Sequence, residues 1–242
     1  MRTRTLALAA ASGAALLAAV TLTPAAHADP ARGAAPAPAG RSGADLKEGS
    51  VSAADLLAKV TSCSQISNGK YRTDEETSAT IPVCGKNGAV FWKADMDIDC
   101  DGEITTACNK DTDPWFQNDT AFPTSAGKPL NAEKLPYVVV PSVSSIWNYG
   151  DAGIKGGGVV AVIYNNQVEY AVVGDTGPNK IIGEASYATA KALGIDPDPE
   201  TGGAESGVTY ILFKNSKVSP IESHGAAVTA GDALAKQFIQ NN

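Results

Sequence analysis

Short apolar runs, bounded by Gly, Asn or Pro, dominate the chain after residue 88. They are rich in Val, Ile and Tyr, a composition typical of β-strands. The polar segment Asn165-Asn166-Gln167 separates two of these runs and predicts a β-hairpin. The predicted strands are residues 89–98, 137–143, 159–164, 168–173 and 208–213.

Helical patterns are fewer than strand patterns. Ser52, with Asp55 three residues later, has the spacing of an N-cap and predicts a helix over residues 53–60. Gly194 stands at a C-cap position and predicts a helix over residues 185–193, and a third helix is expected over residues 225–240. A few short helices among many strands favour a mainly β fold, a barrel with helices in its crossovers, over a parallel βαβ sheet.

The first 28 residues have the three parts of a secretory signal peptide. Arg2 and Arg4 give a basic start, residues 6–22 are almost wholly apolar, and Ala26-His27-Ala28 forms a small-residue cleavage site. A retained membrane anchor is the alternative, which the cleavage site disfavours. We therefore expect a secreted, extracellular protein that does not stay on a membrane.

Residues 29–50 are rich in Ala, Gly and Pro and contain little apolar surface that could be buried. We interpret this segment as a disordered linker or propeptide. Residues 51–242 contain no second linker and no internal repeat, so they are expected to form one domain. No coiled-coil pattern is present either, and a monomer is expected.

The charge balance narrows the choice of partners. The chain has 19 Lys and Arg against 26 Asp and Glu, a formal charge of −7. Cleavage after Ala28 removes Arg2 and Arg4, which leaves 17 basic residues against 26 acidic ones and a charge of −9. This excess of acid disfavours nucleic acid and anionic membranes, and it favours a cationic partner. No Gly-x-Gly-x-x-Gly or Walker motif supports nucleotide binding.

After cleavage, His224 is the only histidine that remains. A zinc site built on two or three imidazoles is therefore excluded. A Ser-His-Asp triad is disfavoured, because no Gly-x-Ser-x-Gly motif accompanies His224. We expect His224 on the surface or at the N-terminus of the last helix, and we expect neither a metal nor a cofactor in the protein.

The mature chain has four cysteines, an even number that indicates disulfides in an exported protein. Four cysteines allow three pairings. We favour Cys63–Cys84 and Cys100–Cys108, because each of these pairs closes a short loop.

Four aspartates at alternate positions, Asp95, Asp97, Asp99 and Asp101, form what we call the acidic row. In a strand they share one face, and Trp92, Ala94, Met96, Ile98 and Cys100 share the other. Same-face neighbours are roughly 7 Å apart, so the carboxylates repel one another unless a cation lies over them. The pattern therefore suggests substrate binding by the row, with a cationic ligand.

Two other interpretations of the acidic row stay open. One is calcium: counted from Asp97, Gly102 falls at the sixth position of an EF-hand loop, but Cys108 stands where the bidentate Glu belongs and the flanks are not helical. A looser calcium site is therefore more plausible than an EF-hand. The other interpretation is a solvated acidic edge strand that deters aggregation.

A second pair of acids surrounds a Gly-Pro turn. Asp175 follows an apolar strand that ends at Gly174, and Glu184 is placed at the start of the next helix. The turn would bring the two carboxyls to one cleft, where the helix dipole would favour the charged form of Glu184 unless burial opposes it. Two carboxyls in different environments are what glycoside hydrolysis needs. Turn capping and helix capping are the purely structural alternatives.

Three motifs in order resemble glycoside hydrolase family 75, the secreted endo-chitosanases of fungi and actinomycetes. They are Ala-Asp-Met-Asp-Ile-Asp-Cys-Asp-Gly (94–102), Gly-Asp-Thr-Gly-Pro (174–178) and Ile-Gly-Glu-Ala-Ser (182–186). The resemblance implies hydrolysis of β-1,4 bonds in partly deacetylated chitosan with inversion. It also implies that Asp175 and Glu184 are the essential acids.

Residues 174–194 also resemble the hallmark stretch of double-psi β-barrels, with Thr176 in place of an Arg and Glu184 in place of a second Asp. This similarity implies a six-stranded barrel with a surface groove, and Asp175 as the general acid with Glu184 on the base side. It also brings an alternative, a peptidoglycan- or other polysaccharide-cleaving enzyme, which the acidic row disfavours. A non-catalytic chitosan- or wall-binding module is a further alternative. Candidate sugar-stacking residues are Tyr137, Trp147, Tyr149 and Tyr164, although such aromatic residues commonly belong to the core.

Overall fold

The computed structural model describes residues 48–242. The predicted signal peptide and residues 29–47 of the predicted linker lie outside the described residues. Among the described residues, no helix is long and apolar enough to cross a lipid bilayer.

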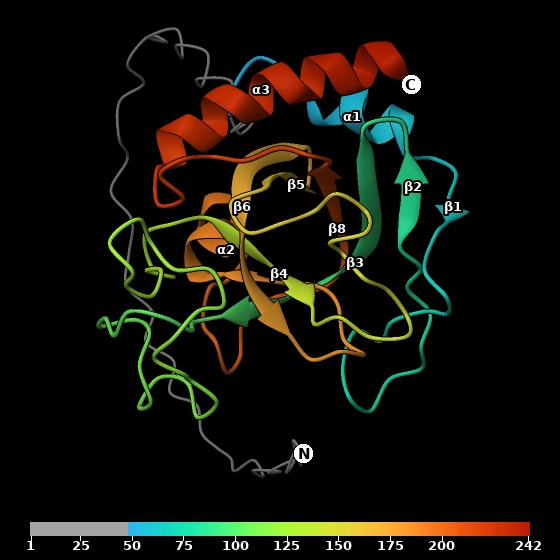
Figure 1. Cartoon of the computed structure of the whole chain (residues 1–242). Coiled ribbons are helices and arrows are strands. Elements are labelled where there is room, and N and C mark those ends of the chain that lie inside the picture. The colour runs from blue at the N-terminus through green and yellow to red at the C-terminus, as the bar shows by residue number, and fades with distance from the viewer. Residues whose placement is uncertain (1–47) are drawn as a thin grey trace, which may run out of the picture. The chain divides into compact units, whose positions relative to one another are not determined.

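Six strands close into a barrel (Figure 1). Their order around the barrel is β3, β7, β4, β6, β5 and β8, and β8 pairs back with β3. The contacts β3–β7 and β4–β6 are parallel and the other four are antiparallel. This confirms the predicted mainly β, six-stranded barrel. The strands are β3 (Ala89–Asp99), β4 (Tyr137–Pro141), β5 (Val159–Tyr164), β6 (Gln167–Gly177), β7 (Glu184–Ser186) and β8 (Ala204–Phe213).

Two further strands extend the sheet beyond β3. The strands β1 (Ser64–Gln65) and β2 (Cys84–Lys86) pair with each other, and β2 pairs with the start of β3. Both are too short for an apolar pattern to reveal them. The two disulfides are Cys63–Cys84 and Cys100–Cys108, which confirms the pairing favoured by the sequence.

Alternation along the strands separates two cores. One cluster of buried side chains has members from all six barrel strands, among them Trp92, Val138 and Tyr210, and fills the barrel. The other lies outside the barrel, where helix α3 (His224–Asn241) covers β5 and β6 and helix α1 (Ala53–Lys59) packs against α3 (Figure 1). Leu56 and Phe238 of these helices pack into that second core. Helix α3 therefore covers one outer face and leaves others open to solvent or ligand.

The local signals in the sequence are largely confirmed. The Ser52 hydroxyl accepts a hydrogen bond from the Asp55 N–H at the start of α1. Asn165 and Asn166 have φ of 44° and 66°, which makes the two-residue turn between β5 and β6 a hairpin turn. Helix α2 (Tyr187–Ala192) starts two residues later than expected, because residues 185 and 186 belong to β7.

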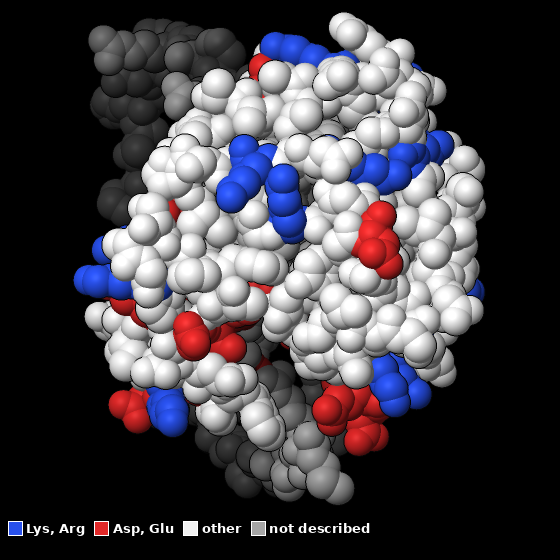
Figure 2. Space-filling view, in the orientation of Figure 1, with Lys and Arg blue, Asp and Glu red and all other residues white. Residues whose placement is uncertain are grey.

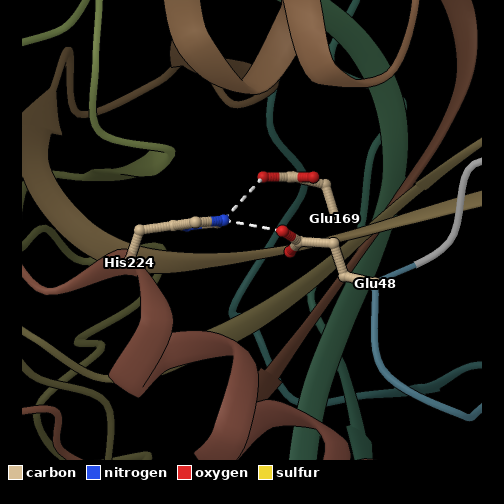
Figure 3. A group of neighbouring side chains, drawn as sticks. All are labelled: Glu48, Glu169 and His224. Atoms are coloured by element: carbon tan, nitrogen blue, oxygen red, sulfur yellow. Dashed lines mark hydrogen bonds and ion pairs between the residues drawn. The ribbon is translucent and has the colours of Figure 1, made fainter.

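Residues 48–50, at the end of the predicted linker, contact the folded domain. Glu48 is hydrogen-bonded to β6, and Ser50 donates to Asp232 of α3. Glu48 lies beside Glu169 of β6 and His224, the first residue of α3 (Figure 3). The His224 Nε2 is 2.6 Å from a Glu48 oxygen and 3.6 Å from a Glu169 oxygen. Burial and the neighbouring charge of Glu48 raise the pKa of Glu169 to about 8. His224 is thus at a helix N-terminus, as predicted, and it helps to attach Glu48 to the barrel.

Candidate active site

Register across four neighbouring strands brings the predicted catalytic residues to one face. Asp97 of β3 pairs with Glu184 of β7, Glu184 pairs with Val139 of β4, and Val139 pairs with Asp175 of β6. Paired residues of neighbouring strands point to the same face of a sheet. Because Val139 belongs to the core outside the barrel, this row faces outward. Asp175, Glu184 and the acidic row therefore share the outer surface.

The route by which the two acids meet differs from the one expected. Glu184 is the first residue of β7 and does not begin a helix, since Ser186 is the N-cap of α2. Asp175 lies inside β6, which continues to Gly177. The two acids therefore lie on strands β6 and β7, with β4 between them. The sequence had predicted that they converge from a strand end and a helix N-terminus.

A bulge at Gly174 turns Asp175 outward. Val138 pairs with Val173, but Val139 pairs with Asp175, so Gly174 is the extra residue. Without it, Asp175 would have the same inward direction as Val173, which lies in the barrel interior. A Cβ at position 174 would lie 2.6 Å from side-chain carbons of Tyr137, which explains why a glycine is needed there.

The acidic row follows the predicted alternation but is not uniform. Asp97 is exposed, Asp99 is partly buried, and Asp101 lies two residues beyond the end of β3. Asp95 is only 8% exposed, and its buried Oδ1 has no hydrogen-bond partner within the described part of the chain. On the opposite face, Trp92, Ala94 and Met96 are buried inside the barrel as predicted, and Ile98 is partly buried. Cys100 lies beyond the end of β3 and is buried in the core outside the barrel, so the predicted alternation does not extend to it.

Burial and mutual repulsion raise the pKa values of these carboxyls. The pKa of Glu184 rises to about 7, mainly through burial and then through the charges of Asp97, Asp101 and Asp175. Burial also raises the pKa of Asp95 to about 8 and that of Asp101 to about 6. The pKa of Asp99 lies well above its ordinary value for the same reason. Burial therefore overrides any dipole effect on Glu184, and the site retains protons at neutral pH.

Asp175 has a different environment from Glu184. Its side chain is 7% exposed, and burial raises its pKa. Two backbone N–H groups, from Ala121 at 2.8 Å and Thr176 at 2.7 Å, donate to Asp175 Oδ1 and oppose this rise, because they stabilise the charged form. The pKa values of both acids are thus raised, but only Asp175 has backbone hydrogen bonds that oppose the rise.

Glycines supply the space in which two of these carboxyls lie. A Cβ at Gly177 would collide with Glu184 Oε2, so the Glu184 side chain reaches across β4 to β6. A Cβ at Gly183 would collide with Asp95 Oδ1 in the same way. Both glycines belong to the sequence motifs, but their steric purpose depends on strand register and was not visible in the sequence.

A loop between β3 and β4 forms one side of the site. The Gln117 N–H donates to Asp101 Oδ1 at 2.6 Å, and the Gly102 N–H donates to the Gln117 carbonyl at 2.8 Å. Ala121, four residues later, reaches Asp175. Figure 2 shows that the barrel surface is hollowed near the ends of β4 and β6, and that acidic side chains lie at the edge of this hollow.

Three carboxyls could hold a cation. Asp99, Asp101 and Asp175 each offer an oxygen within 4.8 Å of the others. This set differs from the EF-hand pattern considered above, because Asp175 comes from another strand and Cys108 is in a disulfide. A looser calcium site would use this group.

Two of the predicted sugar-stacking residues are core residues. Tyr137 is fully buried, and Trp147 packs edge-on against Trp92 inside the barrel. Tyr149 and Tyr164 are partly exposed.

Comparison with known proteins agrees with these motifs. The family model described as fungal chitosanase of glycosyl hydrolase group 75 matches residues 96–241. An endo-chitosanase of Aspergillus fumigatus is 33% identical over 191 residues, which cover 73% of this chain and 79% of that protein. Endo-chitosanase C of Aspergillus oryzae is 30% identical over 193 residues, covering 78% of this chain and 46% of that protein. The chain thus spans about half the length of endo-chitosanase C.

Among solved structures, the Streptomyces papain inhibitor (SPI) aligns with 56% of this chain and 100% of its own, with 18% identity and a TM-score of 0.31. That likeness is too low to support a conclusion. The family match covers more than half of the chain and includes the segments that contain Asp175, Glu184 and three members of the acidic row. The chain belongs to glycosyl hydrolase group 75.

Proposed function

We propose that this protein is an endo-chitosanase that hydrolyses β-1,4 glycosidic bonds of partly deacetylated chitosan. The observation that carries the proposal is the outward-facing row in which Asp97, Glu184 and Asp175 are aligned by strand register. Two carboxyls, both with raised pKa values but only one with backbone hydrogen bonds that stabilise its charged form, lie beside further acids that suit a cationic glycan. The two relatives described above are both named endo-chitosanases, and these names support the same substrate.

Glu184 acts as the general acid in this proposal. Its pKa of about 7 means that it carries a proton at mildly acidic pH, which it can donate to the leaving glycosidic oxygen. Asp175 acts as the general base, since its two backbone hydrogen bonds favour the carboxylate that must accept a proton from water. This assignment reverses the one that the barrel resemblance implies.

Inversion of the anomeric centre is part of the proposal. Strand β4 lies between the two acids, so their backbones are about 10 Å apart, twice the spacing of neighbouring strands. Inverting enzymes need room for a water molecule, with carboxyls roughly 6.5–9.5 Å apart. The Glu184 side chain reaches across β4 towards Gly177 of β6, so the two carboxyls lie closer together than the backbones, and the configuration of the first product decides between inversion and retention.

The acidic row supplies the proposed contacts to glucosammonium groups. Asp97, Asp99 and Asp101 are the accessible or partly accessible members, and Asp95 lies deeper. An ammonium group beside Asp99 and Asp101, whose pKa values are raised, would lower those pKa values and restore the negative charge. These two carboxyls would thus become ionised when a cationic chain binds, which favours chitosan over peptidoglycan or cellulose.

Reducing-end release from chitosan tests this function. Wild type should release reducing ends, and Asp175→Asn and Glu184→Gln should each reduce the rate on the order of a thousandfold. The control Glu205→Gln changes an exposed acid of β8 and should behave as wild type. Unchanged release by either variant would refute that residue's role. An inactive wild type that still binds chitosan would indicate a binding module, and activity on peptidoglycan alone would refute the substrate.

The two roles can be separated by chemistry. Azide should restore cleavage by Asp175→Gly, because it replaces the activated water and yields an azide of inverted configuration. Glu184→Gln should retain activity on a glycosyl fluoride, whose leaving group needs no proton. The opposite pattern of rescue would reverse the assignment, and a retained configuration in the initial wild-type product would refute inversion.

We further propose that the protein is secreted and monomeric. The two disulfides support an oxidising compartment. N-terminal sequencing of the exported protein should begin at Asp29, and light scattering should give the mass of one chain. An uncleaved N-terminus or a dimer mass would contradict these points.

A further inference from the structure

One tryptophan of this protein is almost fully exposed. Trp115 retains 87% of its accessible surface, whereas Trp92 and Trp147 are buried. An indole buries a large apolar area when it meets a partner, and leaving it in water forgoes that gain. Trp92 and Trp147 pack edge-on against each other in the barrel interior, whereas the Trp115 indole is free to meet a ligand.

The backbone around Trp115 is held firmly although the ring is in solvent. The Trp115 N–H donates to Asp113 Oδ1 at 2.9 Å, and the next residue, Phe116, is 4% exposed and packs into the core outside the barrel. The Cys100–Cys108 disulfide closes the preceding part of the loop. The exposed indole is therefore presented on a fixed support.

This support is attached to the candidate active site. Gln117, two residues after Trp115, donates to Asp101 Oδ1 at 2.6 Å. Ala121 donates to Asp175 Oδ1 at 2.8 Å. The segment from 115 to 121 therefore runs along the carboxyls from Asp101 to Asp175, and Trp115 lies at its Asp101 end.

We propose that Trp115 is a sugar-binding platform at the Asp101 end of the site, where it stacks against a glucosamine ring of the bound chain. This inference rests on the proposed function. The C–H groups of a pyranose face pack on an aromatic ring, and an ammonium group near the indole adds a cation–π attraction, for which tryptophan is the best ring. Asp101, which the same loop contacts through Gln117, supplies negative charge at this end of the site. The platform thereby extends substrate contact beyond the bond that is cleaved.

Steady-state kinetics on chitosan test this contact. Trp115→Ala should raise KM about tenfold and leave kcat within twofold of wild type, because the residue does not touch the reacting atoms. Trp115→Tyr, which keeps an aromatic ring, should recover most of the loss. Ile66→Ala removes another exposed apolar side chain, on the β1–β2 side, and should not change KM.

Fluorescence gives a readout that a merely structural role would not move. In the Glu184→Gln background, chitosan oligosaccharide should shift the tryptophan emission and protect it from acrylamide, and adding Trp115→Phe should remove both effects while Trp92 and Trp147 remain. An unchanged KM in Trp115→Ala, or the same fluorescence response with and without Trp115→Phe, would overturn the inference. Hydrolysis by wild type would in that case still support the proposed function. An inactive wild type would instead refute the proposed function.

Discussion

Replacing Glu184 by Gln should stabilise the fold as well as abolish hydrolysis. Burial raises the pKa of Glu184 from its ordinary value of 4.5 to about 7, with further contributions from the charges of Asp97, Asp101 and Asp175. Between these two pH values the folded state binds more protons than the unfolded state. Wild-type stability therefore falls as the pH rises from 4.5 to 7, and above pH 7 the full cost is present.

The size of this effect follows from the pKa. One pH unit corresponds to 1.36 kcal/mol, so the rise to about 7 amounts to about 3 kcal/mol. Glu184 is partly exposed, and solvent screening reduces this figure to about 2 kcal/mol. The neutral amide avoids the cost. At pH 8 the variant should unfold at a temperature about 4–8 °C above that of wild type.

Thermal unfolding at pH 5 and pH 8, followed by circular dichroism, measures this difference. The gain in Tm for Glu184→Gln should be small at pH 5 and reach its full size at pH 8. Glu205→Gln, the exposed control, should show no gain at either pH. An equal gain at both pH values, or a loss at pH 8, would refute the argument that a buried, repelled carboxylate at position 184 costs stability.

Three further predictions concern positions around the site and the N-terminal attachment. In a chitosan assay, Gly177→Ala should lower kcat at least tenfold with little change in Tm, because the added methyl group displaces the Glu184 carboxyl. The control Gly225→Ala should behave as wild type, because a Cβ at position 225 contacts no other atom. Wild type should lose stability between pH 5 and 8, because the pKa of Glu169 is raised to about 8, and Glu169→Gln should reduce this loss. Calorimetry at several pH values measures the loss, and a variant with the same pH profile as wild type would contradict the prediction. Asp97→Asn should raise KM for chitosan about threefold and weaken its salt dependence, and an unchanged salt dependence would exclude the contact.

Local sequence signals predicted the parts of the fold that depend on near neighbours. The strand 159–164 has the predicted ends, the two asparagines form the hairpin turn, and Ser52 caps its helix. Loop length gave the disulfide pairing. Each of these features is decided by residues a short distance apart along the chain.

Features that depend on long-range register could not be predicted. Strand β7 has three residues, too few for an alternating pattern, so Glu184 was assigned to a helix start. The Gly174 bulge that turns Asp175 outward is defined by pairing with β4, 35 or so residues away in the chain. The exposure of Trp115 depends on where the loop between β3 and β4 packs, and a sequence pattern does not report this.

We propose that one outward-facing set of carboxyls both recognises and hydrolyses a cationic glycan. The most direct measurement is the initial rate of reducing-end release by wild type and Glu184→Gln from chitosan and from the same polymer after N-acetylation. Wild type should release reducing ends rapidly from chitosan and lose most of this rate on the N-acetylated polymer, and the variant should release almost none. Equal wild-type rates on the two polymers, or a variant as active as wild type, would contradict the proposal.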